Sequence, residues 1–586
     1  MSSHSHHHGD AGAAVREQRP DIPNSRRADS GRATAAADPA AVIAPLRPSQ
    51  TAALPPEVYL IGCSSDPANG SQPSAQTMGF KAWNLLRMAQ LSLPVPAAFV
   101  IGTHYCLDPV ARELASRPDL WKAGLDALQF STGMALGNAR RPLLLSVRSG
   151  APVSMPGMME TLLNIGLCDA TVGGLLRQTG NPRLVWDAYR RLVAAYGEVV
   201  AGLPAQIFEE AAIEVAGVRD ERDLDFADLR SLTQRFLAVY AEGAGRPFPQ
   251  EPAAQLVGAI EAVFASWLSP KACEYRRMNR IPDAIGTAVT VQRMVFGNAG
   301  GRSGAGVGFT RDPSSGEPVL WVDFLFDAQG EDVVSGRRSA NGHEELSAVL
   351  PEVWQALGDA ARQLENAFGD MQDFEFTVQE GQLFMLQARS GKRTPHAAVR
   401  IALDLLDEGL IGPDLALERT TGLDRETLAL PRMVAQGGAP MVPLGRAASA
   451  SSGVVVGEIA LDEARAAARH AAGASVILVR RDAETSDIAA LESAVGLLTQ
   501  RGARTSHAAV VARQLRKVCL VGCAELSIDE AARTITIGDR TLLEGELLTL
   551  DGNEGAFYAG AARIEIGYPE ELLARLDLFR RRGRTT

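Results

Sequence analysis

The chain has 586 residues, of which 46% are hydrophobic and 22% are charged, a composition typical of folded globular proteins. It contains no uncharged apolar run of about 18 residues and no basic N-terminal segment followed by an apolar one, so we expect neither a membrane span nor a signal peptide. A net charge of −11 without a long basic stripe argues against nucleic acid as a partner.

The length predicts roughly three to four domains. Residues 1–55 are rich in Ala, Pro, Arg, Ser and Asp, so we expect a disordered tail whose histidine cluster is solvated rather than bound to metal. Six cysteines are scattered along the chain, which favours reduced thiols and a cytoplasmic protein. The two that lie close together, Cys519 and Cys523, are expected to be core thiols on a strand and its exit.

Strand-like and helical patterns alternate from about Val58 onward. Helical periodicity dominates Leu175–Val200 and Leu229–Trp267. Strand-like runs occur at Ala97–Ile101, Leu143–Val147, Ala288–Val295, Val319–Phe326 and Phe374–Val378. This pattern predicts an α/β multidomain protein that begins with an α/β domain at residues 56–395, with a helical insertion at about 168–280.

The remainder of the chain predicts a linker and a second α/β domain. Residues 396–440 hold one helix-like segment and then a Gly/Pro-rich stretch ending at Gly437–Pro440, which is typical of a linker. Residues 441–558 mix Ala-rich helices with short apolar strands such as Val476–Val479 and Gly496–Thr499. In residues 559–586, leucines at helical spacing precede Arg580–Arg582, which predicts a C-terminal helix with cations at its end.

A buried strand followed by a glycine-containing loop is predicted at Leu143–Thr161. The strand delivers Arg148, and the loop contains Gly150 and Gly157. Such a loop brings backbone N–H groups close to phosphates, while the arginine supplies a charged fork. Taken alone, the same residues fit an ordinary surface loop.

A β-hairpin is predicted around Gly381. Alternation places Asp373 and Glu375 on one face of the first strand, and Gln387 and Arg389 together on the second. A two-residue turn would put these pairs on opposite faces, whereas a three-residue loop with a bulge at Gly381 would unite them, so we predict that bulge. The two carboxylates could then hold Mg²⁺, while Gln387 positions phosphates and Arg389 supplies positive charge. The alternative is an exposed charged hairpin.

A histidine at the start of a helix gives the sharpest local signal. An apolar strand ends at Thr499, a turn follows, and Thr505 or Ser506 can cap a helix whose first turn contains His507. Histidine is a known covalent nucleophile, and free N–H groups at a helix start stabilise the negative charge of a phosphohistidine. The alternative is a helix-start histidine without chemistry.

The T-S-H-A-A sequence around His507 resembles the phosphohistidine segment of enzymes that interconvert phosphoenolpyruvate and pyruvate. The Leu143–Thr161 segment resembles the ATP-phosphate loop of the pyruvate phosphate dikinase family, and the resemblance covers roughly residues 58–558. It implies an ATP-grasp-like nucleotide-binding domain followed by a swivelling phosphohistidine domain. The family usually has Gly-Gly-Met before Thr-Ser-His, whereas this chain has Arg504 in place of the methionine.

The same resemblance implies the remaining site residues. Lys81 matches the lysine of the family's Gly-Gly-Lys-Gly loop, in which Phe80 and Ala82 replace two glycines. The run Gly304–Gly308 is expected to close over phosphates, and Thr505 matches a threonine that is regulated in some relatives. The implied catalytic residues are His507, Arg148 and Arg389, and the implied Mg²⁺ ligands are Asp373 and Glu375. Among the nucleotide ligands, Gln292 to Val295 would contact the adenine and Glu331 the ribose. The full set of implied nucleotide ligands is Lys81, Arg148, Gly157, Met159, Gln292, Val295, Glu331, Gln387 and Arg389.

The reaction implied by the resemblance converts ATP and inorganic phosphate into AMP, pyrophosphate and phospho-His507, from which pyruvate takes the phosphoryl group to form phosphoenolpyruvate. Relatives normally continue into a (β/α)₈ barrel that binds pyruvate and phosphoenolpyruvate, whereas this sequence ends at Thr586. We therefore expect a short form that uses a separate barrel protein, and analogy with the family suggests a homodimer. The alternatives are a carrier-type phosphotransferase with another small-molecule acceptor, and a non-catalytic nucleotide sensor.

Overall fold

The computed structural model describes residues 54–63, 71–108, 110, 112–113, 117–153, 155, 158–217, 219, 223–334, 343–434, 441–482, 488–504 and 506–583. The expected disordered tail lies almost wholly outside the described residues, as do Gly157, Gly437–Pro440 and Thr505. Among the helices that are described, none is long and apolar enough to cross a membrane. All six cysteines are free thiols, and Cys519 and Cys523 are buried, as predicted.

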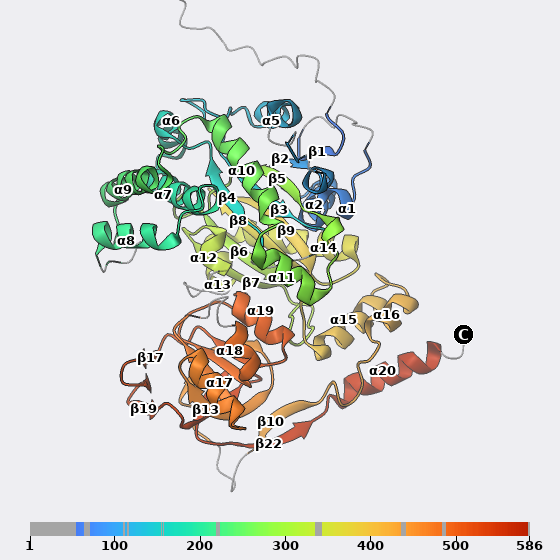
Figure 1. Ribbon diagram of the computed structural model, residues 1–586. Helices are drawn as coiled ribbons and strands as arrows, with labels where there is room; N and C mark the ends of the chain where they lie inside the picture. Colours follow the sequence, from blue (N-terminus) through green and yellow to red (C-terminus); the bar gives the residue numbers. More distant parts are fainter. Residues whose placement is uncertain are drawn as a thin grey trace, which may run out of the picture. The chain divides into compact units, whose positions relative to one another are not determined.

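An antiparallel five-stranded sheet with the order β1-β2-β5-β3-β4 forms the centre of the first part of the chain (Figure 1). Its strands are β1 (Val58–Ile61), β2 (Ala98–Ile101), β3 (Leu145–Gly150), β4 (Thr161–Ile165) and β5 (Ala288–Arg293). Three of them confirm predicted strands. One face packs against helices of a mostly helical segment, and the other packs against α2 (Phe80–Gln90), so the sheet is buried on both faces.

The helical segment follows β4 and confirms the predicted helical periodicity. It comprises α6 (Asp169–Thr179), α7 (Pro182–Val199), α8 (Ala205–Ala216), α9 (Phe226–Ala244), α10 (Pro252–Ser266) and α11 (Pro270–Asn279). Helix α7 begins at a typical start signal: Asn181 is the N-cap and accepts a hydrogen bond from the Leu184 N–H at 3.0 Å, and Pro182 occupies the first turn. Its apolar side chains pack beside α9, and α5 (Pro118–Thr132) covers β1 and β2.

A second antiparallel sheet has the order β7-β6-β8-β9, and its strands are β6 (Gly304–Phe309), β7 (Trp321–Phe326), β8 (Gln372–Gln379) and β9 (Gln382–Ser390). One hydrophobic cluster joins this sheet to α2, α14 (Pro351–Phe368) and the first sheet. Between β7 and α14 lie α12 (Gly330–Val334) and α13 (His343–Val349). Helix α2 is therefore held by apolar packing against both sheets.

The glycine run in β6 does not form a loop over phosphates, so that expectation is wrong. Gly304, Gly306 and Gly308 lie in a fully buried strand paired on both sides. A Cβ atom would lie 2.2 Å from the Phe324 ring at Gly304 and 2.5 Å from the Phe376 ring at Gly306. The glycines are needed because phenylalanine rings lie directly across that face of the strand.

The hairpin turn also differs from the prediction. Gln379 pairs with Gln382, so the turn has two residues, Glu380 and Gly381, with φ values of 51° and 82°. The predicted three-residue loop with a bulge at Gly381 is therefore wrong. The register instead shifts between Glu375 and Phe376, where β9 accommodates one extra residue. That bulge restores the pairing of Asp373 with Arg389 and of Glu375 with Gln387, so the four side chains still share one face.

The later part of the chain contains an eight-stranded sheet with the order β11-β21-β20-β13-β14-β15-β16-β12. Its strands β13 (Val454–Ala460), β14 (Val476–Arg480), β15 (Gly496–Thr499) and β16 (Val518–Val521) are parallel, and β14 and β15 confirm predicted strands. The antiparallel strands are β11 (Gly445–Arg446), β12 (Ala448–Ser451), β20 (Leu547–Asp551) and β21 (Ala556–Ala559). Helices α17 (Glu463–Ala471), α18 (Ile488–Ser493) and α19 (His507–Gln514) connect the parallel strands, and β17 (Leu526–Asp529), β18 (Thr534–Ile537) and β19 (Arg540–Leu543) form a small separate sheet.

The segment after β9 and the end of the described chain pack against each other. Helices α15 (Pro395–Asp407) and α16 (Pro413–Arg419) are followed by β10 (Leu430–Val434), which pairs with β22 (Arg563–Gly567) in a two-stranded ribbon (Figure 1). The predicted C-terminal helix is α20 (Glu570–Gly583), and it lies beside α15, where Arg575 forms ion pairs with Asp404 and Asp407. Residues that precede the eight-stranded sheet in the chain therefore pack against residues that follow it, in one small hydrophobic cluster.

Candidate functional site

Two glycines bring the start of α2 against the end of β3. Gly79 precedes α2 with φ 75° and ψ 154°, and a Cβ atom there would lie 1.7 Å from the Gly150 carbonyl oxygen. The Phe80 N–H donates to the Ala151 carbonyl at 2.9 Å. Phe80 and Ala82 themselves lie inside the helix, so the two positions where the family has glycine have ordinary helical geometry here. The close approach places Lys81 next to the strand that carries Arg148.

A buried amide fixes the same helix to β9. Asn84, which is 2% exposed, donates its Nδ2 hydrogen to the Ala388 carbonyl at 2.8 Å. Lys81 precedes Asn84 by three residues and therefore lies on the same face of α2. Sequence analysis did not identify Asn84, although a polar residue on an otherwise apolar helix face is the signal that could have revealed it.

Charged side chains from both sheets meet at this point. Arg389 donates its Nε hydrogen to Asp373 Oδ2 at 2.8 Å, and Arg148 Nη2 lies 3.8 Å from Glu375 Oε2. Burial lowers the pKa of Lys81 to about 8, with neighbouring Arg148 and Arg389 lowering it further against the opposing effect of Glu375. Lys81 is nevertheless exposed to solvent as a residue, so the protein that surrounds its amino group does not enclose it completely. The structure thus brings these predicted residues together.

One carboxylate oxygen of Asp373 is available to bind a cation. Its side chain is 3% exposed, and its Oδ1 atom is buried without a hydrogen-bond partner among the described residues. Desolvation raises the pKa of Asp373, although Arg389 opposes the shift. The described residues contain no cluster of three or more His, Cys, Asp or Glu side chains that could cage a metal. Mg²⁺ commonly binds through one or two carboxylates and substrate phosphates, so Asp373 and Glu375 fit such an ion.

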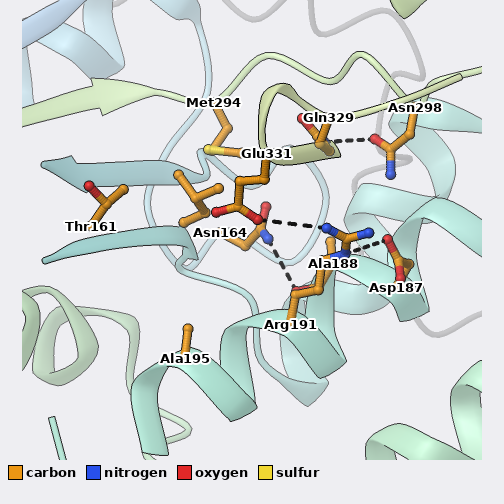
Figure 2. A pocket seen from close by; sticks show the side chains of 11 residues that line it. Thr161, Asn164, Asp187, Ala188, Arg191, Ala195, Met294, Asn298, Gln329 and Glu331 are labelled. Carbon is orange, nitrogen blue, oxygen red and sulfur yellow. Dashed lines mark hydrogen bonds and ion pairs between the residues drawn. The ribbon is translucent and has the colours of Figure 1, made fainter. Parts of the chain in front are cut away.

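A pocket beside this cluster is lined by residues of β4, α7 and α12 and by the segment that follows β5 (Figure 2). In it, Arg191 lies 3.7 Å from Glu331 and 3.0 Å from Asp187. Burial would raise the pKa of Asp187, but Arg191 and Arg190 together lower it. The cavity volume is about 50 Å³, far below the several hundred of a complete ligand pocket.

Arg191 and Asp187 were missed by sequence analysis. Their signal is a pair of charges on the buried side of an amphipathic helix, since Asp187 is only 4% exposed. On the opposite wall, Gln329 donates to Asn298 at 2.7 Å, so the pocket rim is polar (Figure 2). Such a mixture of carboxylate, guanidinium and amide groups suits a hydroxylated ligand.

The residues predicted at the adenine are placed near this pocket but differ in exposure. Met294 lines the pocket, whereas Val295 is buried. The Gln292 side chain is 2% exposed, and its amide donates a hydrogen bond to the Pro96 carbonyl at 3.0 Å, so this donor is already used within the protein. Met159 is half-buried against the hydrophobic cluster of the first sheet.

His507 is the first residue of α19, as predicted. Ser506 is the N-cap, and its hydroxyl accepts a hydrogen bond from the Ala509 N–H at 3.4 Å. The helix buries Ala509 and Ala512 against the eight-stranded sheet. Arg504, the departure from the family pattern, lies with its guanidinium 3.6 Å from Asp323 and 4.2 Å from the Trp321 ring centre.

Two family models match the chain. The AMP/ATP-binding domain of pyruvate phosphate dikinase matches residues 125–345 and 340–409, and the mobile domain of PEP-utilising enzymes matches residues 473–555. The first match covers the β3 and β8–β9 residues of the charged cluster, and the second covers α19.

Three similar proteins illustrate the relationship. Pyruvate, phosphate dikinase of Clostridium symbiosum is 42% identical over 525 residues, which are 87% of this chain and 60% of that protein. The chloroplastic enzyme of Flaveria trinervia is 40% identical over 94% of this chain and 57% of its own length. Pyruvate, phosphate dikinase 2 of Zea mays is 42% identical over 84% and 56%. The chain thus spans no more than 60% of these relatives, and it belongs to the pyruvate phosphate dikinase family.

Proposed function

We propose that the chain transfers the β-phosphoryl group of ATP to His507, with inorganic phosphate as the second substrate. The observation that supports this proposal is the convergence of Lys81, Arg148 and Arg389 with Asp373 and Glu375 at the junction of two sheets. Three cations match a triphosphate, and two carboxylates match the metal ion that accompanies it.

Each side chain has a distinct role in this proposal. Arg148 and Arg389 offer planar guanidinium groups to phosphate oxygens, and Lys81 adds a compact charge. Asp373 and Glu375 hold Mg²⁺, assisted by Gln387, which is paired with Glu375 across the hairpin. When bound, Mg²⁺ neutralises developing charge on the phosphate oxygens. Glu331 is proposed as a ribose ligand, held in place by Arg191; Gln292 and Val295 remain proposed adenine neighbours, as does Met159.

The proposed step conserves all phosphoryl groups. The bond between the β-phosphorus and the oxygen that bridges to the α-phosphorus breaks, and AMP leaves with that oxygen. The unprotonated ring nitrogen of His507 forms the new bond to the β-phosphorus, and the other ring nitrogen can release its proton to solvent. Inorganic phosphate attacks the γ-phosphorus, whose bond to the oxygen that bridges to the β-phosphorus breaks; that oxygen stays with the β-phosphoryl group, and pyrophosphate leaves. The N–H groups at the start of α19 stabilise the anionic product.

The proposed final acceptor is pyruvate, which becomes phosphoenolpyruvate on a separate barrel protein. The names of the relatives support pyruvate as acceptor. A different small-molecule acceptor is the second candidate, because Arg504 changes the charge beside the carrier histidine.

The test uses ATP labelled separately at the β and γ positions, with Mg²⁺ and inorganic phosphate. We expect acid-labile β label on the wild type and none on His507→Ala. His470→Ala is the matched control, because His470 is an exposed histidine of α17, and it should label like the wild type. Label from the γ position alone, or equal labelling of His507→Ala, would contradict the proposal. Chase of labelled protein with pyruvate, with and without a barrel protein, then identifies the acceptor.

A further inference from the structure

Helix α19 carries a second group besides His507 that calls for a functional explanation. Arg513 lies near its C-terminal end and is 2% exposed. Arginine is rarely buried to this extent without a carboxylate partner. Among the described residues, no carboxylate lies within ion-pair distance of Arg513, and burial lowers its pKa.

The contacts of Arg513 place its guanidinium at the start of the helix rather than at its end. Its Nε donates to the Ala450 carbonyl of β12 at 2.9 Å, and its Nη2 donates to the Arg504 carbonyl at 3.3 Å. Arg504 precedes His507 by three residues. Because helical side chains lean toward the N-terminus, Arg513 reaches back along α19 to the segment that leads into the carrier histidine.

The third guanidinium nitrogen has no partner. Nη1 of Arg513 is buried and makes no hydrogen bond within the described part of the chain. The rings of Phe309 and Trp321 lie 5.7 and 5.9 Å from the guanidinium carbon, at the outer limit of cation–π attraction. These rings cannot replace an anion, and the carboxylates that act on the guanidinium, Asp373, Asp312 and Asp323, do so from beyond ion-pair distance.

A second unsatisfied donor lies where the same segment begins. Thr499 ends β15 and is fully buried, and its Oγ1 has no hydrogen-bond partner among the described residues. Buried polar groups are nearly always hydrogen-bonded, so two exceptions at the two ends of one short segment indicate that a polar group is absent. A phosphoryl group on His507 would supply the missing negative charge.

We propose that Arg513 is a positioning residue that stabilises the phosphorylated form of His507: two of its nitrogens fix the carrier segment to β12, and its charge, which no described carboxylate meets at ion-pair distance, favours the anionic adduct. This inference rests on the proposed function, because it concerns phospho-His507. It assigns to Arg513 a part in the balance between the free and the phosphorylated carrier.

The experiment measures the equilibrium labelling of the full chain by β-labelled ATP while AMP and pyrophosphate are titrated. Arg513→Met removes the charge, Arg513→Lys keeps it, and Arg516→Met is the control, because Arg516 is an exposed arginine three residues further on. We expect Arg513→Met to shift the equilibrium about tenfold or more toward the free carrier, the size expected for a nearby opposite charge. Arg513→Lys and Arg516→Met should stay near the wild type, and the KM for ATP should be unchanged in all three.

The outcomes separate the two proposals. If the wild type takes up no β label, the proposed function fails, whereas a labelled wild type with an unshifted Arg513→Met variant overturns only the role of Arg513. Equal shifts in Arg513→Met and Arg513→Lys would also overturn it, because charge would then not be the cause. If Arg513→Met does not fold, the lysine variant decides alone: retention of the wild-type equilibrium supports the role of charge, and its loss refutes it.

Discussion

Arg389 faces Asp373 across β8 and β9, with Nε 2.8 Å from Oδ2, while the other carboxylate oxygen of Asp373 is buried without a partner. One half of this carboxylate is therefore neutralised by protein, and the other half is available to a cation. The pairing depends on the bulge in β9, because an unbroken register from the two-residue turn would place Arg389 on the opposite face.

Asp373→Asn should abolish most of the phosphoryl transfer. The amide keeps the shape of the side chain but loses the charge that would hold Mg²⁺, so we expect His507 labelling to fall by about a hundredfold. Saturating Mg²⁺ and ATP should raise the thermal midpoint of the wild type but not of the variant. Scanning calorimetry with and without Mg²⁺ checks this, and an undiminished Mg²⁺ effect in the variant would show that the ion binds elsewhere.

The same variant makes a prediction about pH. Desolvation raises the pKa of Asp373 above its ordinary value of 3.8, so the folded protein holds this proton more tightly than the unfolded chain. Stability from this group is therefore complete below 3.8 and declines as the pH rises through the raised pKa. Without Mg²⁺, the wild type should lose stability relative to Asp373→Asn across that interval, and a difference that is constant with pH would contradict the argument.

The sequence predicted which side chains of the hairpin meet, but not how. The alternation of side chains required one extra residue in the hairpin to bring Asp373 and Glu375 to the same face as Gln387 and Arg389. Alternation alone does not show whether that residue lies in the turn or in a strand. The φ values of Glu380 and Gly381 fit a tight two-residue turn, so the extra residue moved into β9. Local pattern thus determined the partners, whereas the position of the bulge depends on packing between strands.

Other features of the site could not be predicted, because they depend on contacts between distant segments. The glycines of β6 were expected to close over phosphates, and only the rings of Phe324 and Phe376 explain them. Sequence analysis did not single out Arg191, because its role depends on the approach of Glu331 in α12 to α7. His507, in contrast, was placed correctly because its helix start is encoded locally by a capping serine and the strand before it.

The lowered pKa of Lys81 predicts a pH limit for ATP binding. The amino group is charged below its pKa of about 8 and attracts phosphates only in that form. The affinity for ATP should therefore decline above that value, by at most about tenfold for each pH unit, and level off where Arg148 and Arg389 alone hold the phosphates. Calorimetric titration from neutral to alkaline pH measures this, and Lys81→Arg should remove the decline because its charge persists. A parallel decline in Lys81→Arg would assign the effect to another group.

Gly306→Ala should destabilise the protein without a specific effect on nucleotide affinity. Its Cβ would lie 2.5 Å from the buried Phe376 ring, so the strand or the ring must move. Phe376→Leu shortens that ring, and the double variant should lose less stability than the sum of the single ones. Thermal midpoints test the coupling. A change in the KM for ATP at full stability would instead favour a direct role of β6 at the phosphates.

Gly79→Ala tests whether the start of α2 must touch β3. The added Cβ would lie 1.7 Å from the Gly150 carbonyl oxygen, and the backbone has φ 75° and ψ 154°, a region open essentially only to glycine. Gly409→Ala is the matched control, because Gly409 has φ 73° and no atom within 4 Å of the added carbon. The control should lower the thermal midpoint by about 2–4 °C, which corresponds to roughly 1 kcal/mol of left-handed strain.

In Gly79→Ala the strain of this glycine-only region is joined by overlap with Gly150, so the midpoint should fall by more than in the control, corresponding to about 3 kcal/mol or more. Any protein that remains folded must displace the start of α2, which moves Lys81 away from Arg148 and weakens ATP binding. Calorimetry gives the midpoint, and titration with ATP gives the affinity. Equal effects of the two substitutions on both quantities would mean that the contact between Gly79 and Gly150 does not position Lys81.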